Sequence, residues 1–286
     1  MKRLIVCLDG TWNVPDAGPN PTNVVKIMRA IRDAGSDGAP QVTFYDKGVG
    51  TGGPIDRIRG GAFGRGLDTN VQDGYRFLCN NYVPGDEIYL FGFSRGAFTA
   101  RSLAGFIGWM GLLEKSAMAR LPEAWQSYKD HDEALRAELR AVHGRAEKRA
   151  VRIRCVGVWD TVGALGIPGK LGNSFTRGKY RFHDTQLGDH IDFGFHALSI
   201  DERRGPFEPT LWSTLVDNDI STERVRQVWF PGVHSNVGGG YRDAGLSDLA
   251  LDWMIGEVSR ATDLVFDRGY CREQVSGDPE ATLCDS

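Results

Sequence analysis

Residues 86–107 read Asp-Glu-Ile-Tyr-Leu-Phe-Gly-Phe-Ser-Arg-Gly-Ala-Phe-Thr-Ala-Arg-Ser-Leu-Ala-Gly-Phe-Ile, and the fold follows from them. Residues 87–91 are an apolar run of strand length, and apolar residues recur with helical spacing from Arg95 onward. Between them lies the G-x-S-x-G motif Gly92–Gly96. A serine on a tight strand-to-helix turn can project its hydroxyl only if the residues two before and two after it lack colliding side chains. The pattern indicates a nucleophile, Ser94; the alternative is a glycine-rich turn whose serine only caps the helix.

The composition is ordinary for a globular protein of one large domain. The chain has 286 residues, of which 41% are hydrophobic and 25% are charged. Its formal net charge of −3 gives no basic excess, so nucleic acid is not indicated as a partner. The five cysteines are scattered and form no C-x-x-C pair, so neither a zinc site nor a disulfide framework is implied. We expect no cofactor.

The N-terminus reads Met1-Lys-Arg-Leu-Ile-Val-Cys-Leu-Asp9. Its apolar run of about five residues is too short for the core of a signal peptide and far too short to span a bilayer. We therefore expect it to be the first strand. We also expect no integral membrane segment and a cytoplasmic location, although secretion without a cleaved signal would leave no trace in the sequence.

Apolar runs of strand length alternate along the chain with segments of helical periodicity. Strands are predicted at 4–8, 42–45, 87–91, 152–159 and 225–230, and helices at 21–32, 67–82, from 95 onward, 196–204 and 246–258. This alternation predicts an α/β fold with a mainly parallel central sheet and helices on both faces. We assign residues 1–270 to a single domain and residues 271–286 to a polar, poorly ordered tail.

Two stretches look like additions to this sheet. Residues 114–150 are rich in charges of both signs and carry apolar residues at helical spacing. They are either helices inserted over the active site as a lid, or an outer helix pair with a solvated face. A long glycine-rich loop then runs from Thr161 to about residue 190. Loops of this length in a compact domain are usually functional or mobile.

Three polar residues each directly follow a predicted strand: Ser94, Asp160 and His234. The carboxyl ends of parallel strands meet at one edge of a sheet, so we expect these side chains to lie together. A serine hydroxyl is a poor nucleophile until a neutral imidazole takes its proton, and the imidazole needs a carboxylate to hold its tautomer. The order Ser-Asp-His is that of α/β-hydrolases, so the sequence predicts that fold with these residues as a catalytic triad.

Backbone amides would have to stabilise the oxyanion of such a reaction. We expect these donors to be Arg95 and, in the loop after the first strand, Gly10 or Thr11. The run Asp9-Gly10-Thr11 also resembles the D-x-D-G-T of haloacid-dehalogenase phosphatases, but the position of their nucleophile is occupied here by Cys7. A third interpretation of the run Asp9-Gly10-Thr11 is a tight turn without any catalytic role.

Other residues compete for these roles. His196 and Asp201 lie on one predicted helix and are the rival base and acid, or simply structural groups. The run 201–204 is either a salt-linked helix end or a site that orients an anionic head group. The remaining histidines lie in the charged insertion (His131, His143) or in loops without a preceding strand (His183, His190).

Gly48–Gly53 matches the pattern G-x-G-x-x-G of dinucleotide-binding proteins. It follows the second strand rather than the first, and the residues after it lack the helix that a pyrophosphate would need. We therefore predict a glycine-rich loop near the rim of the active site.

Five motifs in this order resemble an uncharacterised α/β-hydrolase family related to type VI secretion phospholipase effectors. They lie at residues 8–13, 92–97, 158–163, 196–204 and 231–241, and the resemblance spans roughly residues 4–260. It implies that Ser94 is the nucleophile, Asp160 the acid and His234 the base. In the secreted members the activity is lipase or phospholipase action on membrane glycerophospholipids. The chain resembles their catalytic domain, and we expect no long membrane-engaging extension.

The sequence therefore predicts a serine hydrolase that cleaves carboxylic esters and resembles lipases and phospholipases. Its partner would be a small-molecule or lipid ester substrate, with peripheral membrane contact compatible with that role. A catalytically silent, hydrolase-like binding module that presents its glycine-rich loops to a partner is the alternative. A phosphatase that uses Asp9 is a third.

Overall fold

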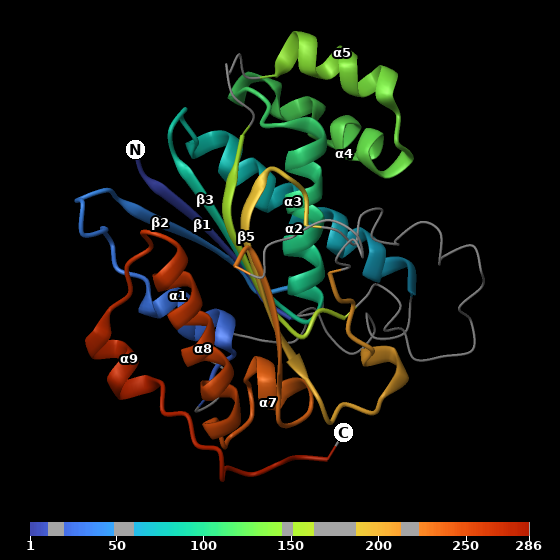
Figure 1. Ribbon diagram of the computed structural model, residues 1–286. Helices are drawn as coiled ribbons and strands as arrows, with labels where there is room; N and C mark the ends of the chain where they lie inside the picture. The colour runs from blue at the N-terminus through green and yellow to red at the C-terminus, as the bar shows by residue number, and fades with distance from the viewer. Residues whose placement is uncertain (11–19, 49–59, 145–150, 163–186, 213–222, 286) are drawn as a thin grey trace.

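The computed structural model describes residues 1–10, 20–48, 60–144, 151–162, 187–212 and 223–285. Within these ranges six parallel strands form one sheet in the order β2-β1-β3-β4-β5-β6 (Figure 1). The strands are β1 (Arg3–Leu8), β2 (Gln41–Asp46), β3 (Glu87–Phe93), β4 (Ile153–Trp159), β5 (Ile191–Ser199) and β6 (Val225–Phe230). The α-helices are α1 (Asn23–Ala30), α2 (Gly60–Asn81), α3 (Arg95–Met110), α4 (Leu121–Asp130), α5 (Glu133–His143), α7 (His234–Gly238), α8 (Gly245–Ala261) and α9 (Arg268–Gln274).

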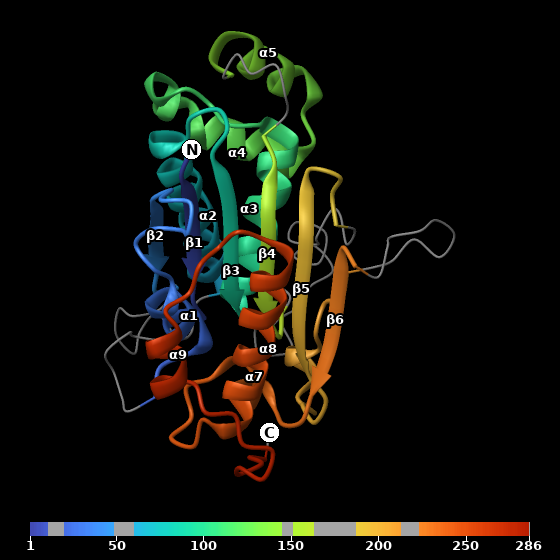
Figure 2. The ribbon, with the colours of Figure 1, turned by 60° about the vertical axis from the view of Figure 1, so that its left-hand side comes forward.

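Helices cover both faces of the sheet (Figure 2). Leu4 and Val6 of β1 pack in a core with α2 and α3, whereas Ile5 and Cys7 pack on the other face with α1 and α8. A strand whose side chains are buried on both faces has an unbroken apolar sequence, as residues 4–8 have. The predicted α/β class with a parallel sheet between two helical layers is confirmed.

Helix α1 begins where a local sequence signal places it, but one predicted helix begins earlier than its sequence suggested. Thr22 is the N-cap of α1, because its hydroxyl accepts a hydrogen bond from the Val25 amide at 3.4 Å. That helix is α2, which begins at Gly60 rather than at residue 67. Gly60–Gly66 carries four glycines, which weaken the helical pattern in the sequence.

Strand β5 replaces the helix predicted over residues 196–204. Alternate side chains of β5 point to opposite faces of the sheet: Phe195 packs in the core on the α8 side, and His196 lies against Trp212 in the core on the α3 side. β4 and β6 pair with β5 along both of its edges. Pairing on both edges outweighs the modest helical propensity of a short His-Ala-Leu run, so the helix prediction is wrong.

Helices α4 and α5 lie at the opposite end of the sheet from Ser94. α3 begins directly after Ser94 and is about 24 Å long, and the helix pair packs at its far end. There the Arg136 Nε donates to the Trp109 carbonyl at 2.8 Å, and the Trp109 indole donates to the Ser127 hydroxyl at 3.3 Å. Figure 2 shows both helices beside the amino ends of the strands. The described part of residues 114–150 is therefore not a lid over the predicted site.

The chain after residue 270 is bonded to the domain rather than loose. Helix α9 spans the boundary that the sequence predicted. Beyond it, the Ser276 amide donates to Asp248 at 3.0 Å, and the Thr282 carbonyl accepts from the Asn236 side chain at 3.2 Å. Since Asn236 lies on α7, residues 276–284 contact the helix that begins with His234.

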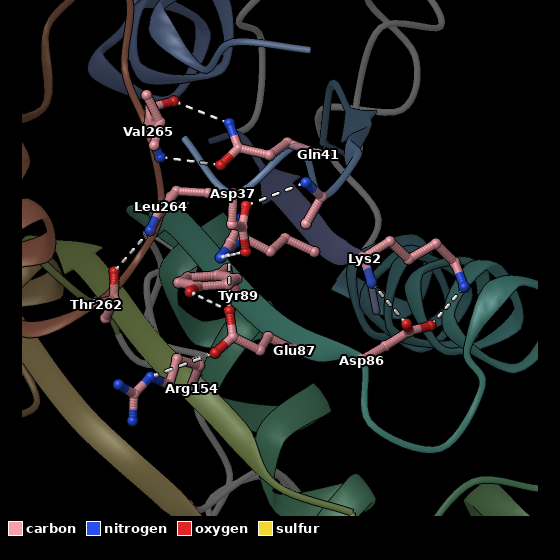
Figure 3. A network of polar contacts seen from close by, with 12 residues as sticks. Lys2, Asp37, Gln41, Asp86, Glu87, Tyr89, Arg154, Thr262, Leu264 and Val265 are labelled. Carbon is pink, nitrogen blue, oxygen red and sulfur yellow. Dashed lines mark hydrogen bonds and ion pairs between the residues drawn. The ribbon is translucent and has the colours of Figure 1, made fainter. Parts of the chain in front are cut away.

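A polar network joins the strands at their amino ends (Figure 3). The backbone amide and the ammonium of Lys2 both donate to Asp86, at 2.8 and 2.5 Å. Gln41 exchanges two hydrogen bonds of 2.9 Å with the backbone of Val265, which ties β2 to the segment after α8. These contacts hold the sheet together at the end opposite to Ser94.

Candidate active site

The carboxyl ends of β1 and β3 meet at the point where the strand order reverses. β1 lies between β2 and β3, so the chain leaves β1 toward one neighbour and later returns on its other side. Ligands of open parallel sheets bind at the carboxyl ends of the strands at such a switch point. Ser94 follows β3 and Asp9 follows β1, so both lie there.

Ser94 has the backbone of a nucleophile turn. Its φ of 59° and ψ of −120° are unfavourable for a residue with a side chain, and its hydroxyl makes no capping bond to α3. A Cβ on Gly92 would lie 2.4 Å from the carbonyl oxygen of Gly96, and one on Gly96 would lie 2.0 Å from that of Leu8. The two flanking glycines are therefore sterically required, and the alternative of a simple capping serine does not describe this turn.

The substitution Gly96→Ala is expected to lower the free energy of unfolding by about 2–3 kcal/mol, because a rigid backbone carbonyl occupies the space of the new methyl group. Urea unfolding measures this change. Gly256→Ala is the control, since nothing lies within 4 Å of a Cβ at that position of α8. It should raise stability by up to about 1 kcal/mol. Equal unfolding curves for Gly96→Ala and the unsubstituted chain would contradict the steric account.

Ser94, His234 and Asp160 form a continuous chain of contacts. The Oγ of Ser94 lies 2.8 Å from Nε2 of His234, and Nδ1 of His234 lies 2.6 Å from Oδ2 of Asp160. All three side chains are buried. An ionised carboxylate can only accept, so it places the imidazole proton on Nδ1 and leaves Nε2 to accept the serine hydroxyl. The structure thus brings together the three residues that the sequence singled out.

Backbone bonds between neighbouring strands position the carboxylate. Asp160, with a φ of 39°, donates its amide to the carbonyl of Ala197 at 2.7 Å. Its Oδ1 accepts from the Ser199 amide at 3.0 Å, which leaves Oδ2 for His234. The Ser94 amide donates to the Trp159 carbonyl at 3.1 Å, so the turn of Ser94 is fixed to the strand that leads into Asp160.

His234 is the first residue of α7 and is held by groups that the sequence did not single out. Its amide donates to Glu202 at 3.2 Å, and its ring contacts those of Phe93 and Phe207, with centroids 4.6 and 4.9 Å away. Burial alone would raise the pKa of Glu202, but hydrogen bonds from Arg204 and from the His234 amide outweigh it and lower this pKa to about 2. Glu202 therefore stays an anion that fixes the backbone of His234.

With this geometry defined, comparison with known proteins identifies the family. The model of the family described as "T6SS, Phospholipase effector Tle1-like, catalytic domain" matches residues 2–257. The chain belongs to this family. The resemblance recognised from five sequence motifs is thereby confirmed.

Individual relatives are longer than this chain. A Saccharomyces cerevisiae protein, "Uncharacterized protein YEL023C", is 31% identical over 258 residues, which cover 78% of this chain and 36% of that protein. A crystal structure of an uncharacterized protein from Pseudomonas aeruginosa is 16% identical, with a TM-score of 0.55, over 97% of this chain and 49% of that one. The Tle1 effector bound to the VgrG spike of the type 6 secretion system is 18% identical, with a TM-score of 0.48, over 85% and 52%. The chain thus spans between about a third and a half of these proteins.

The three backbone amides expected to stabilise the oxyanion of this Tle1-like domain belong to Arg95, Gly10 and Thr11, and the structure treats each differently. Arg95 is the first residue of α3 and directly follows Ser94. Gly10 lies at the switch point, but its amide donates to Asp9 at 2.7 Å, so it is already engaged. Thr11 lies outside the described residues, as do residues 49–53 of the glycine-rich loop and His183. Arg95 is thus the candidate donor that the structure places beside Ser94.

Asp9 is a structural acceptor in this site. Its carboxylate accepts from Gly10, from the Thr22 hydroxyl at 2.6 Å and from the Tyr45 hydroxyl at 2.9 Å. It thereby joins the end of β1 to the N-cap of α1 and to β2. Burial raises the pKa of the Cys7 thiol, which lies two residues earlier within β1. Neither Asp9 nor Cys7 is therefore placed as the nucleophile that a phosphatase reaction would need.

The rival base and acid do not contact Ser94. His196 is fully buried in β5, and its Nε2 accepts from the Thr161 amide at 3.2 Å. Burial, assisted by the charge of Arg101, lowers the pKa of His196 to about 3, so the ring is neutral. Asp201 accepts from the Gly232 amide at 2.7 Å and fixes the turn that leads to His234.

The neutral ring of His196 makes stability depend on pH. The pKa of His196 is lowered in the folded state, so the unfolded chain binds more protons below about pH 6.5, and the free energy of unfolding decreases as pH falls. The contribution approaches about 1.4 kcal/mol per pH unit. His196→Gln keeps an acceptor for Thr161 and should flatten this slope between pH 6.5 and 4.5. Urea unfolding at several pH values measures it, and identical slopes in both proteins would disprove the assignment.

Proposed function

We propose that this chain is a serine hydrolase that cleaves carboxylic esters of glycerophospholipids. The observation that carries the proposal is the chain of contacts from Ser94 through His234 to Asp160, at 2.8 and 2.6 Å. The lipid substrate class is inferred from membership of the Tle1-like phospholipase family. Among the described residues no helix is both long and apolar enough to cross a bilayer.

The geometry supports a two-step reaction. Ser94 Oγ attacks the ester carbonyl while Nε2 of His234 takes its proton, and Asp160 stabilises the imidazolium that results. The Arg95 amide is the expected donor to the oxyanion that develops, and one such donor typically contributes roughly 3–4 kcal/mol. His234 then protonates the departing alcohol, and the acyl group stays bound to Ser94 as an ester. Water, deprotonated by His234, hydrolyses this acyl-enzyme and restores the serine.

Fatty-acid release from glycerophospholipids, measured beside a series of p-nitrophenyl esters of rising chain length, tests this function. We expect the protein to hydrolyse both glycerophospholipids and p-nitrophenyl esters. Ser94→Ala should abolish both activities. Hydrolysis of p-nitrophenyl esters alone would retain the serine mechanism and reject the phospholipid substrate. Magnesium-dependent phosphate release that survives Ser94→Ala would instead support a phosphatase. A folded protein inactive on every substrate would indicate a silent binding module.

A further inference from the structure

Three large apolar side chains are exposed on β6 and on the segment that follows β5. Ile200 is 62% exposed, Leu211 41% and Trp229 49%. We call these three residues the apolar rim. Large apolar side chains at this exposure are common singly, but a group of them beside a reactive centre marks a contact surface.

Strand pairing brings two rim residues together. Trp229 of β6 lies opposite Leu198 of β5, and the Ile200 amide donates to the carbonyl of Phe230 at 3.1 Å. Side chains two residues apart on a strand share a face. Trp229 therefore lies on the same face as Gln227, and Ile200 continues the face of Leu198. Both rim residues lie at the carboxyl ends of neighbouring strands.

The segment 207–212 links the third rim residue to the candidate base. Phe207 packs on His234, and the Thr210 amide donates to the Thr161 carbonyl at 3.0 Å. One residue beyond Leu211, Trp212 is hydrogen-bonded to Gln227 through both its amide and its carbonyl, at 2.8 and 3.0 Å. The segment thus runs from Phe207 at the reactive centre to Trp212 beside the middle of β6, with Leu211 exposed next to Trp212.

The charges next to the rim suit an anionic surface. Arg203 and Arg204 are both exposed. Arg204 pairs with the buried Glu202 at 2.7 Å and stacks 3.9 Å over Phe207, whereas no ion pair of Arg203 is seen within the described ranges. Glu208, which is also exposed, is the acidic group on the same segment. Tryptophan, branched aliphatic residues and arginine together are typical of surfaces that lie in the interface between lipid head groups and acyl chains.

We propose that the apolar rim, assisted by Arg203, docks this domain on a phospholipid bilayer with the Ser94 site facing the membrane. The inference rests on the proposed function, because a lipid substrate has to leave the bilayer to reach Ser94. Docking at the rim places the source of substrate beside the reactive serine.

Co-sedimentation with vesicles tests the proposal, with Ser94→Ala in every protein so that the lipid stays intact. Vesicles of phosphatidylcholine alone and of phosphatidylcholine mixed with phosphatidylglycerol are compared. We expect the double variant Ile200→Ser, Trp229→Ser to lower the partition coefficient by about tenfold or more on both. Arg203→Gln should lower it on the anionic vesicles only. Val142→Ser is the matched control, because Val142 is 66% exposed on α5 at the opposite end of the sheet.

The same double variant with Ser94 intact is assayed on a water-soluble p-nitrophenyl ester and should keep its rate within about twofold, which shows that the fold and the reactive centre are unchanged. Failure of the Ser94→Ala protein to bind either vesicle would overturn docking. So would a fall in the partition coefficient of Val142→Ser as large as that of the double variant. Binding that depends on the rim, without any Ser94-dependent ester hydrolysis, would instead reject the proposed function and keep the docking surface.

Discussion

Ser94→Ala is expected to lower kcat on a water-soluble p-nitrophenyl ester by about 10⁶-fold, the scale seen when the nucleophile of another serine hydrolase is removed. The change deletes the hydroxyl oxygen that lies 2.8 Å from Nε2 of His234 and that would form the acyl-enzyme. Steady-state kinetics with a long assay time measure the residual rate. KM should change little, because the hydroxyl contributes to the transition state rather than to substrate binding.

Ser116→Ala is the matched control for this loss. Ser116 is exposed, and its hydroxyl lies 3.4 Å from Glu114 in the part of the chain that precedes α4, far from the switch point. Its kcat should equal that of the unsubstituted enzyme. More than a tenth of the original kcat in Ser94→Ala, with the same fold, would mean that another group performs the reaction.

Asp160→Asn is expected to lower kcat by about 10⁴-fold near pH 7, as in serine proteases, while the protein stays folded. The amide oxygen can still accept from the Ser199 amide, so the turn after β4 keeps its bond. The amide nitrogen, however, would face Nδ1 of His234 and favour the tautomer with the proton on Nε2. That tautomer cannot take the proton of Ser94. Kinetics and thermal unfolding, measured on the same preparation, separate a loss of kcat from a loss of folded protein.

Asp201→Asn tests the rival acid in the same assay. Asp201 accepts from the Gly232 amide and has no contact with the ring of His234, so kcat should fall by less than about tenfold. If Asp201→Asn abolished activity and Asp160→Asn left it intact, the assignment of the acid would be wrong.

The nucleophile turn and the two partner residues were predictable because each is a local signal. Gly92 is needed because a Cβ there would lie 2.4 Å from the carbonyl oxygen of Gly96, within the same turn. Asp160 and His234 each follow a strand, and parallel pairing then brings the strand ends together without further information. The coarse fold follows from the same alternation of strands and helices.

The features that sequence reasoning missed depend on long-range contacts. β5 forms a strand because β4 and β6 flank it, and nothing within residues 196–204 shows those neighbours. Glu202 was included only in a charged run, and its bond to the His234 amide depends on a turn 32 residues later. The Asn236–Thr282 contact similarly links α7 to a segment that looked like a tail.

The position of α4 and α5 could not be predicted from composition. Charged helices with one apolar face look alike whether they cover a site or an outer surface. The direction of α3 decides the matter, since it carries the chain from Ser94 to the opposite end of the sheet before α4 begins.

Covalent labelling with a fluorophosphonate tests the central claim most directly, because such probes react with a serine only when a neighbouring base activates it. The folded protein should form a single adduct, located by peptide mass spectrometry on Ser94. Labelling should disappear in Ser94→Ala and become much slower in His234→Ala. An adduct on a different residue, or no adduct on folded protein, would contradict the assignment of Ser94, His234 and Asp160 as the reacting groups.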